Sequence, residues 1–279
     1  MAATKTAERR RPARPAKRSA TRPSRPRKGE PGTLLYAYCA VRGAQPDLAD
    51  APAGLPGMSP PFAVALGGDR WLIAAQAPSR LYGAAVIETR AGDLDWLSAC
   101  ALAHEAVIEQ QMQAPALVPL KLFTLFSSAA VAKRRLSARR AALDETLDRL
   151  AGCAEWGVRV HARPDPALKL PQRAASGRGF LEGKRDARRA AQQALQTTQA
   201  EAERGFTALA GVAGESRRLP APPGASPGLA LDAVFLVPRR RQAKFDAAFE
   251  GVAARLAAGH AEVVLSGPWP AYHFVEPAG

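Results

Sequence analysis

From residue 34 onward, short apolar runs of strand length alternate with longer segments whose apolar residues recur every three or four positions. Short runs of this kind are typical of β-strands, and the longer periodic segments are typical of amphipathic helices. No run approaches the roughly 18 consecutive apolar residues that a membrane-spanning helix needs. The chain is therefore expected to be a soluble α+β protein with more than one layer of secondary structure.

The first half of this pattern predicts a small sheet with two helices. Three apolar runs read as strands: residues 34–41 (LLYAYCAV), 62–66 and 70–75. A Gly-Gly-Asp turn separates the last two, which favours a hairpin. One helix is expected from an N-cap at Asp93 to about residue 113, and another from Ser127 or Ser128 to about Leu150, with an extended stretch at 118–126 between them.

The second half predicts the order β-α-β-β-α-β. The expected strands are residues 156–162, 217–219, 229–237 and 263–266, and the expected helices are 178–210 and 240–258. This order is the split βαβ arrangement of ferredoxin-like domains, in which right-handed crossovers place both helices on one face of the sheet. The sequence thus predicts two α+β domains, at 32–153 and 154–279, the second of them ferredoxin-like.

The net charge of +14 is concentrated at the N-terminus. Residues 1–30 hold eleven Lys or Arg against Glu8 and Glu30, a net of +9, so the remainder carries only +5. Residues 1–31 are therefore expected to be a disordered basic tail. Such a tail can bind polyanions without sequence preference, but a solvated, solubilising arm is the simpler interpretation.

The cysteines and the N-terminus both point to the cytoplasm. Cys39, Cys100 and Cys153 are odd in number and widely spaced within apolar segments, which favours reduced, buried thiols. The tail has no apolar segment of the kind that a secretory signal requires, although an Arg-rich transit peptide is possible on composition alone.

Two near-matches to catalytic motifs fail on chemical grounds. His104-Glu105 begins like the zinc metalloprotease motif, but Ile108 stands where the second histidine belongs. His104 lies on the apolar face of its helix, so a core position is the better interpretation. The run Gly224 to Gly228 fits G-x-S-x-G, but Pro227 lacks the N–H that an oxyanion hole takes from the residue after the serine.

Other candidate groups are equally incomplete. Gly177, Gly179 and Gly183 precede Lys184, but their spacing misses both the Walker and the dinucleotide-binding patterns. The acidic residues near Asp144 are expected to pair with Arg140 and its neighbours along one helix face. We therefore expect no enzyme activity, no catalytic residues, no metal and no cofactor.

Taken together, the segments resemble the gas vesicle F/L family (GvpF and GvpL). The resemblance covers about residues 33–276 and rests on the order and spacing of several stretches: LLYAYCAV, LDWLSACALAHEAVIEQ, VPLKLFTLF, EWGVRVHA, GRGFLEGKRDARR, LDAVFLV and SGPWPAYHF. The sequence departs from the family pattern at Lys121 and Phe123, where an Arg is usually followed two positions later by Gly, and in its long basic tail. These departures bear on the subtype, F-like or L-like.

The resemblance implies a two-domain α+β protein that is cytoplasmic, associates with the gas vesicle, and helps to nucleate or build its shell. The implied partners are the small hydrophobic shell protein and other gas vesicle accessory proteins. It implies neither catalysis nor a cofactor. Both a permanent shell component and a transient assembly factor fit this description.

The candidate partner-binding residues are Trp269, Tyr272 and Phe274, in the stretch GPWPAYHF. Two prolines hold the backbone extended there, so the aromatic side chains could be presented to a partner at a small cost in ordering entropy. The plainer interpretation is that these aromatics cover the end of the sheet between the domains.

Two other classes of function stay open. A nucleic-acid binder would combine the basic tail with a sheet of the RNA-recognition type, but the strands offer only Trp156 and Phe235 as stacking residues and lack the basic-Gly-aromatic signature. An enzyme would need a deep pocket with convergent polar groups between the domains.

Overall fold

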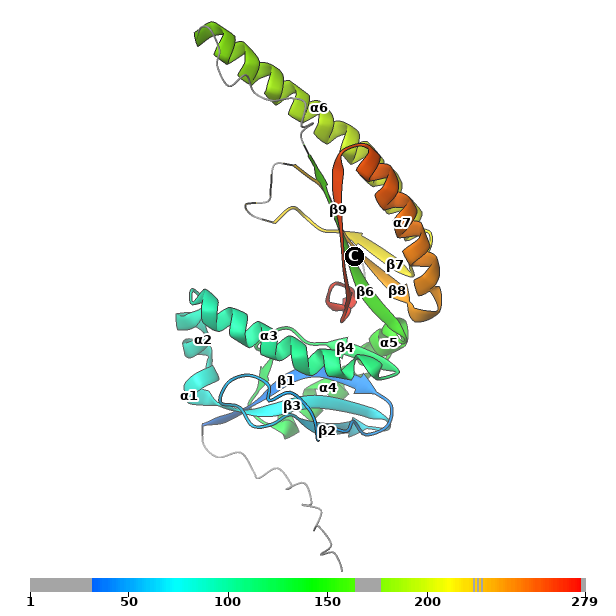
Figure 1. The fold of residues 1–279 in the computed structure, drawn as a ribbon. Coiled ribbons are helices and arrows are strands. Elements are labelled where there is room, and N and C mark those ends of the chain that lie inside the picture. The colour runs from blue at the N-terminus through cyan, green and yellow to red at the C-terminus, as the bar shows by residue number, and fades with distance from the viewer. Residues whose placement is uncertain (1–31, 164–176, 223, 225, 227, 277–279) are drawn as a thin grey trace, which may run out of the picture.

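The computed structural model describes residues 32–163, 177–222, 224, 226 and 228–276, which form two sheets that follow one another along the chain (Figure 1). The predicted basic tail, residues 1–31, lies outside the described residues. All of the strand pairs in both sheets are antiparallel. The protein therefore belongs to the mixed α and β class that the sequence predicted.

The first sheet is built around β1 (Thr33–Arg42), which pairs with β3 (Arg70–Pro78) on one side. The outer strand next to β3 is β2 (Phe62–Gly67), which confirms the predicted hairpin. On its other side β1 pairs with two short strands, β4 (Ala116–Pro119) and β5 (Leu125–Phe126).

Residues 34–41 of β1 form an uninterrupted apolar run, because helices cover both faces of the strand. On one face, Tyr36 and Tyr38 pack with Val107 and Ile108 of α3 (Leu94–Gln110). On the other face, the side chains of β1 pack against α4 (Ala129–Ala138) and α5 (Arg140–Leu150). The short helices α1 (Ser79–Tyr82) and α2 (Ala84–Arg90) connect β3 to α3, and the turn η1 (Gln111–Gln113) follows α3.

The sequence predicted the N-caps of α3 and α4 correctly, but it missed a break between α4 and α5. Asp93 caps α3 by accepting the N–H of Trp96 at 3.0 Å, and Ser128 caps α4 by accepting that of Val131 at 3.3 Å. The single helix predicted from Ser128 to Leu150 is wrong, because the chain leaves helical geometry at Arg139. The break lets α4 pack against β2 and β5 while α5 packs against β4.

The extended stretch predicted at 118–126 is interrupted by a turn between β4 and β5. Thr124 closes this turn by donating its N–H and its hydroxyl to the carbonyl oxygen of Lys121, at 3.1 and 2.6 Å. Phe123 takes a left-handed conformation (φ 62°), which is the geometry that glycine adopts without strain. Its ring stacks on Trp96, with centroids 5.2 Å apart, and holds the turn against α3.

The second sheet has the strand order β7-β8-β6-β9. Its strands are β6 (Cys153–Ala162), β7 (Glu215–Arg218), β8 (Leu229–Pro238) and β9 (Ala261–Trp269). Helix α6 (Gly177–Ala210) lies between β6 and β7 in sequence, and α7 (Gln242–Ala258) follows β8 after the short turn η2 (Arg239–Arg241). These elements occur in the order that the sequence predicted.

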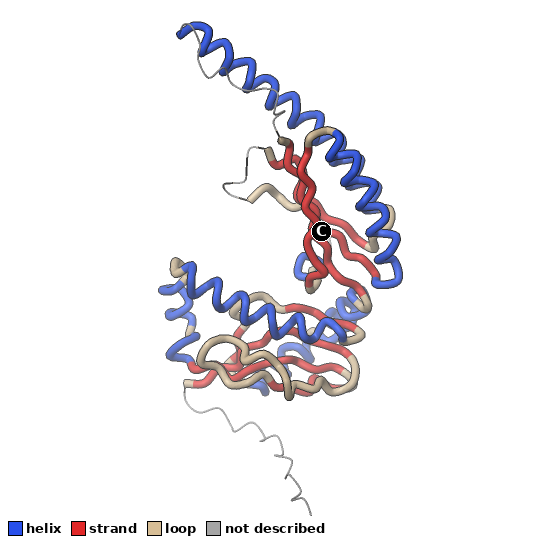
Figure 2. The backbone as a smooth tube through the Cα atoms, viewed as in Figure 1, coloured by secondary structure: helices blue, strands red, loops and turns tan. Residues whose placement is uncertain are grey.

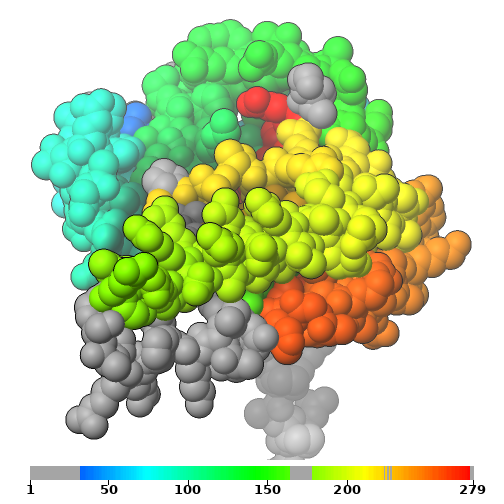
Figure 3. Space-filling view, turned by 90° about the horizontal axis from the view of Figure 1, so that it is seen from above, coloured from blue at the N-terminus to red at the C-terminus, as the bar shows by residue number. Residues whose placement is uncertain are grey.

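Helices α6 and α7 cover the same face of the second sheet and lie side by side (Figures 1 and 3). Phe206 of α6 and Phe245 of α7 both pack against Phe235 of β8, with ring centroids 5.4 and 5.6 Å apart. A Cβ at Gly205 would lie only 2.7 Å from Val252, so this glycine allows the two helices to approach. The N-terminal part of α6 projects beyond the sheet (Figure 2).

A third hydrophobic cluster joins the half of the chain that forms the first sheet, which ends with α5, to the half that forms the second sheet, which begins with β6. We call this region of contact the junction. Leu147 and Leu150 of α5 pack there with Val234 and Leu236 of β8 and with Phe274, which lies in the short helix η3 (Tyr272–Phe274). The second sheet thus buries one face under α6 and α7 and part of the other face against the first half. None of the helices in the described part of the chain combines the length and hydropathy required to span a bilayer.

Candidate functional site

The predicted partner-binding aromatics lie in residues 267–276, which we call the C-terminal segment, but they do not form one exposed surface. Trp269 ends β9 and is 41% exposed, whereas Phe274 is fully buried in the cluster between the two halves. Tyr272 is half-buried and packs against the core of the first half. Phe274 is thus inaccessible to a partner in this structure, and partner contact through Trp269 stays a prediction.

Two arginines hold the backbone and the ring at Phe274. Arg149 of α5 donates through Nη2 to the carbonyl oxygen of Phe274 at 2.6 Å and to that of Val275 at 3.3 Å. Its Nη1 lies 3.0 Å from the carboxylate of Glu215 on β7. The guanidinium of Arg217 lies over the Phe274 ring, 5.0 Å from its centroid. The C-terminal segment is therefore attached to both halves.

Tyr272 reaches across the junction to α3, where its hydroxyl donates to Oε2 of Glu105 at 2.8 Å. The other oxygen, Oε1, is buried with no hydrogen-bond partner among the described residues. Burial raises the pKa of Glu105, and burial together with the Glu105 hydrogen bond raises the pKa of the Tyr272 phenol. The phenol therefore stays protonated and serves as a hydrogen-bond donor, not as a base or nucleophile.

His273 makes a second buried contact with a carboxylate. Glu155 is only 4% exposed, and it accepts the backbone N–H of His273 at 3.0 Å and lies 2.6 Å from its Nδ1. The hydrogen bond to Glu155 raises the pKa of His273. Glu155 lies on β6 beside Trp156, whose side chain points to the opposite face, under α7.

A cleft of about 390 Å³ lies between the turn after β4 and the C-terminal segment. It is lined by Pro119, Leu120, Lys121, Thr124, Arg217, Tyr272, His273, Val275 and Glu276. The Lys121 side chain is 90% exposed, and the Nε atom of Arg217 is buried and without a partner among the described residues.

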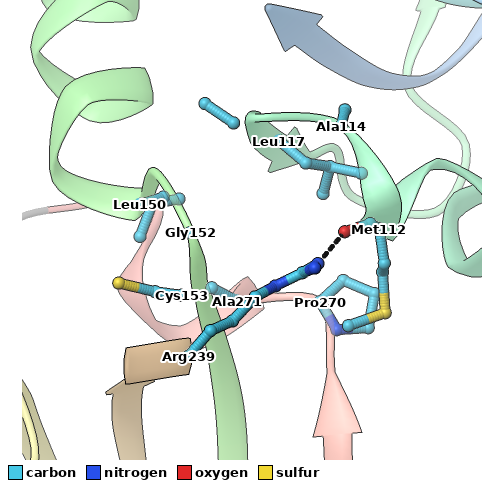
Figure 4. Close-up of a pocket in the computed structure, with 10 residues that line it drawn as sticks. Met112, Ala114, Leu117, Leu150, Gly152, Cys153, Arg239, Pro270 and Ala271 are labelled. Atoms are coloured by element: carbon cyan, nitrogen blue, oxygen red, sulfur yellow. Dashed lines mark hydrogen bonds between the residues drawn. The ribbon is translucent and has the colours of Figure 1, made fainter. Parts of the chain in front are cut away.

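A much smaller cavity, of about 20 Å³, lies on the same junction (Figure 4). Arg239 crosses it and donates through Nη2 to the carbonyl oxygen of Met112. Its walls include Leu117, Leu150 and Ala271. The space is about that of one water molecule, so this cavity is a packing gap with a hydrogen bond across it.

His104, from the incomplete zinc-protease motif, has a structural role. His104 is 3% exposed, and its Nε2 donates to the carbonyl oxygen of Leu120 at 3.0 Å while Nδ1 lies 2.7 Å from the Tyr36 hydroxyl. Burial lowers its pKa, which favours the neutral ring. Within the described ranges, no three His, Cys, Asp or Glu side chains come together to hold a metal ion. Residues 225 and 227 of the G-x-S-x-G stretch lie outside the described residues.

Comparison with known proteins identifies the family of this chain. The profile of the family described as "Gas vesicle synthesis protein GvpL/GvpF" matches residues 34–276. The chain belongs to the GvpL/GvpF family. A relative from Streptomyces sp. (strain CB03234), named gas vesicle protein L, is 30% identical over 254 residues, which is 86% of this chain and 92% of the relative.

Two solved GvpF structures share the fold. The crystal structure of GvpF from Anabaena sp. PCC7120 aligns with a TM-score of 0.64 at 17% identity, over 88% of this chain and 98% of that chain. GvpF from Microcystis aeruginosa aligns with a TM-score of 0.61 at 14% identity, over 87% of this chain and 99% of that chain. The mixed fold with antiparallel sheets is therefore the fold of GvpF.

Within this GvpL/GvpF chain, the residues that organise the junction were mostly missed by sequence reasoning. Glu105, Glu155 and Arg149 occur on a helix or strand whose local pattern explains them as ordinary polar positions. Their partners at residues 272–275 lie more than a hundred residues away in sequence. The one available signal was the stretch GPWPAYHF itself, which marked the segment that they hold.

Proposed function

We propose that this chain is an accessory or minor structural protein of gas vesicle assembly. It acts through protein–protein contacts with the small gas vesicle shell protein and with other gas vesicle accessory proteins, in the cytoplasm and on the gas vesicle. The single observation that carries this proposal is the family match across residues 34–276. The name of the Streptomyces relative, gas vesicle protein L, supports it.

The finer architecture is part of the same proposal. We assign residues 32–153 and 154–279 to two domains and the second of these to the ferredoxin-like class, with 1–31 as a basic tail. The order β7-β8-β6-β9 and the shared face of α6 and α7 support the ferredoxin-like assignment. The antiparallel pairing of β6 with both β8 and β9 is a further support.

The function that we propose needs no catalytic step. Two of the titratable side chains beside the large cleft already have partners: Tyr272 bonds to Glu105, and His273 bonds to Glu155. The pKa of the Tyr272 phenol is raised, which is the opposite of what a nucleophile or a base would require. These features support a binding protein over an enzyme.

The two aromatic residues that could stack on bases, Trp156 and Phe235, lie on the covered face of the second sheet, which disfavours the nucleic-acid alternative. An RNA-recognition sheet stacks bases on the face that its helices leave open. Trp156 and Phe235 instead pack beneath α7, each near Phe245, with ring centroids 6.4 and 5.6 Å away. Neither ring is available for base stacking from that face.

A complementation experiment tests the proposed function. The gene for this chain is deleted from its host, and gas vesicles are counted by electron microscopy with and without a plasmid copy. We expect few or no vesicles in the deletion strain and recovery with the plasmid. Normal vesicle numbers in the deletion strain would contradict a role in assembly.

A further inference from the structure

The cleft between the β4–β5 turn and the C-terminal segment gathers basic side chains from both halves of the chain. Lys121 comes from the turn, Arg217 from β7 and His273 from the C-terminal segment. Between them lie apolar side chains, including Leu120 and Val275. A groove of this kind combines charge with apolar contact area, as sites for polypeptide segments do.

The cations are not all neutralised by the protein. Among the residues that the structure describes, the Nζ of Lys121 pairs with one acidic side chain, that of Glu276 at 3.9 Å, and both of these side chains are more than 80% exposed. The Nε of Arg217 is buried without a hydrogen-bond partner in the described part of the chain. The exposed Lys121 ammonium is therefore the cation that a ligand in the cleft can reach.

The protein's own Glu276 illustrates what the cleft accepts. Arg217 donates through Nη2 to the backbone carbonyl oxygen of Glu276 at 2.5 Å, and the Glu276 carboxylate faces Lys121. The preceding residue, Val275, lines the apolar part. An apolar residue followed by an acidic residue thus already occupies the edge of the cleft, and the Glu276 carboxylate is held there only by a weak, exposed contact.

We propose that this cleft binds an acidic segment of a partner protein, whose carboxylate replaces that of Glu276 beside Lys121 and whose apolar neighbour packs on Leu120. The apolar lining and the 390 Å³ of space favour a polypeptide over a free inorganic anion, which would need only the charged groups. A nucleic acid is disfavoured because it requires a longer array of Lys and Arg along its backbone. This inference stands on the cleft alone and does not depend on the gas vesicle role.

The test uses the full chain and a fluorescent peptide that contains a Leu-Glu pair and a photo-reactive residue. Affinity is measured by fluorescence anisotropy, and mass spectrometry maps the cross-links. We expect cross-links at residues 119–124 and 272–276. Cross-links confined to residues 1–31 would overturn the proposal, because they would show capture by the basic tail only.

Charge variants make the test quantitative. Lys121→Glu is expected to weaken binding by roughly tenfold, because it reverses the charge that faces the carboxylate. Glu276→Ala removes the internal competitor and should tighten binding by about threefold. Lys244→Glu, a matched change at an exposed lysine of α7, should leave the affinity within about twofold.

Three results would contradict the proposal. One is equal weakening by Lys121→Glu and Lys244→Glu, which would mean that only net charge matters. The second is unchanged or weaker binding in Glu276→Ala. The third is displacement of the peptide by inorganic phosphate where chloride of equal ionic strength has no effect, which would identify a free-anion site. Circular dichroism of each variant checks that the fold is retained.

Discussion

Arg149 on α5 and Glu215 on β7 form an ion pair between the two halves of the chain, with Nη1 and Oε1 3.0 Å apart. Both side chains are more than two-thirds buried, and Arg149 also holds the carbonyl oxygens of Phe274 and Val275. One guanidinium thus connects α5, β7 and the C-terminal segment. This contact makes the junction a defined interface with directional bonds, in addition to its apolar cluster.

Arg149→Met should lower the free energy of unfolding by roughly 2 kcal/mol, because it leaves Glu215 and two carbonyl oxygens without their charged donor. Urea unfolding followed by circular dichroism measures this loss. The matched control is Arg178→Met, whose pair with Glu182 is exposed on α6 and should contribute less than about 0.5 kcal/mol. Equal effects of the two changes would contradict the account of the junction.

Phe274→Ala should be among the most destabilising single changes in the C-terminal segment. The ring is fully buried between the halves, so its removal leaves a cavity and should cost about 3–5 kcal/mol. Trp269→Ala serves as the comparison, because its ring is 41% exposed and its loss should cost roughly 1 kcal/mol. Urea denaturation of both variants distinguishes the two positions. The reverse order of effects would show that Trp269 is the packing residue.

The contact between His273 and Glu155 predicts a pH dependence of stability. The pKa of His273 is raised above its usual 6.5 by the hydrogen bond to Glu155, so the folded state favours the protonated ring. This contribution is fully present below pH 6.5 and is lost as the pH rises through the raised pKa. His273→Gln should remove this part of the dependence.

The measurement for His273 is a series of urea unfolding curves between about pH 5 and pH 9. His161→Gln is the control for the loss of a histidine on the same open face of the second sheet. If the pH dependence of the wild type persists in His273→Gln but disappears in His161→Gln, the effect belongs to His161 and the prediction for His273 is wrong.

Asp144 predicts a dependence of the opposite sign at low pH. It accepts hydrogen bonds from Arg70 of β3, with Nη2 to Oδ2 at 2.9 Å, and lies 3.8 Å from Arg42 of β1 and 3.7 Å from Arg140. The hydrogen bond with Arg70 lowers the pKa of Asp144 below its usual 3.8. Its stabilising contribution is therefore present above pH 3.8 and is lost as the pH falls through the lowered value.

Asp144→Asn should accordingly be less stable than the wild type at pH 7, and the difference should shrink as the pH approaches 3. Unfolding curves at several pH values test this. Asp186→Asn, on the exposed projecting part of α6, is the control and should leave the curves unchanged. A constant difference at all pH values would mean that the Asp144 carboxylate charge is not what stabilises the fold.

Local patterns in the sequence predicted most of the elements but few of their contacts. The N-cap at Asp93, the hairpin at 62–75 and both helices of the second half follow from turn chemistry and periodicity over a few residues. The break at Arg139 was missed because neither glycine nor proline marks it, and it depends on which strands α4 and α5 cover.

Long-range partners were the other limit of sequence reasoning. The acidic residue Asp144 was expected to pair along its own helix, yet it also binds arginines of β1 and β3, which lie 102 and 74 residues away. The contact of Tyr272 with Glu105 spans 167 residues. No pattern within one element encodes such a pair, because it exists only once both sheets have formed and the C-terminal segment lies between them.

The measurement that tests the central claim most directly is co-purification of the full chain with the small gas vesicle shell protein after co-expression, at moderate and at high salt. A second preparation lacks residues 1–31 and separates capture by the basic tail from capture by the folded part, because electrostatic attraction weakens with ionic strength. The account predicts stoichiometric capture that survives both high salt and loss of the tail. No capture at either salt concentration, with both proteins soluble and folded, would contradict direct contact with the shell protein.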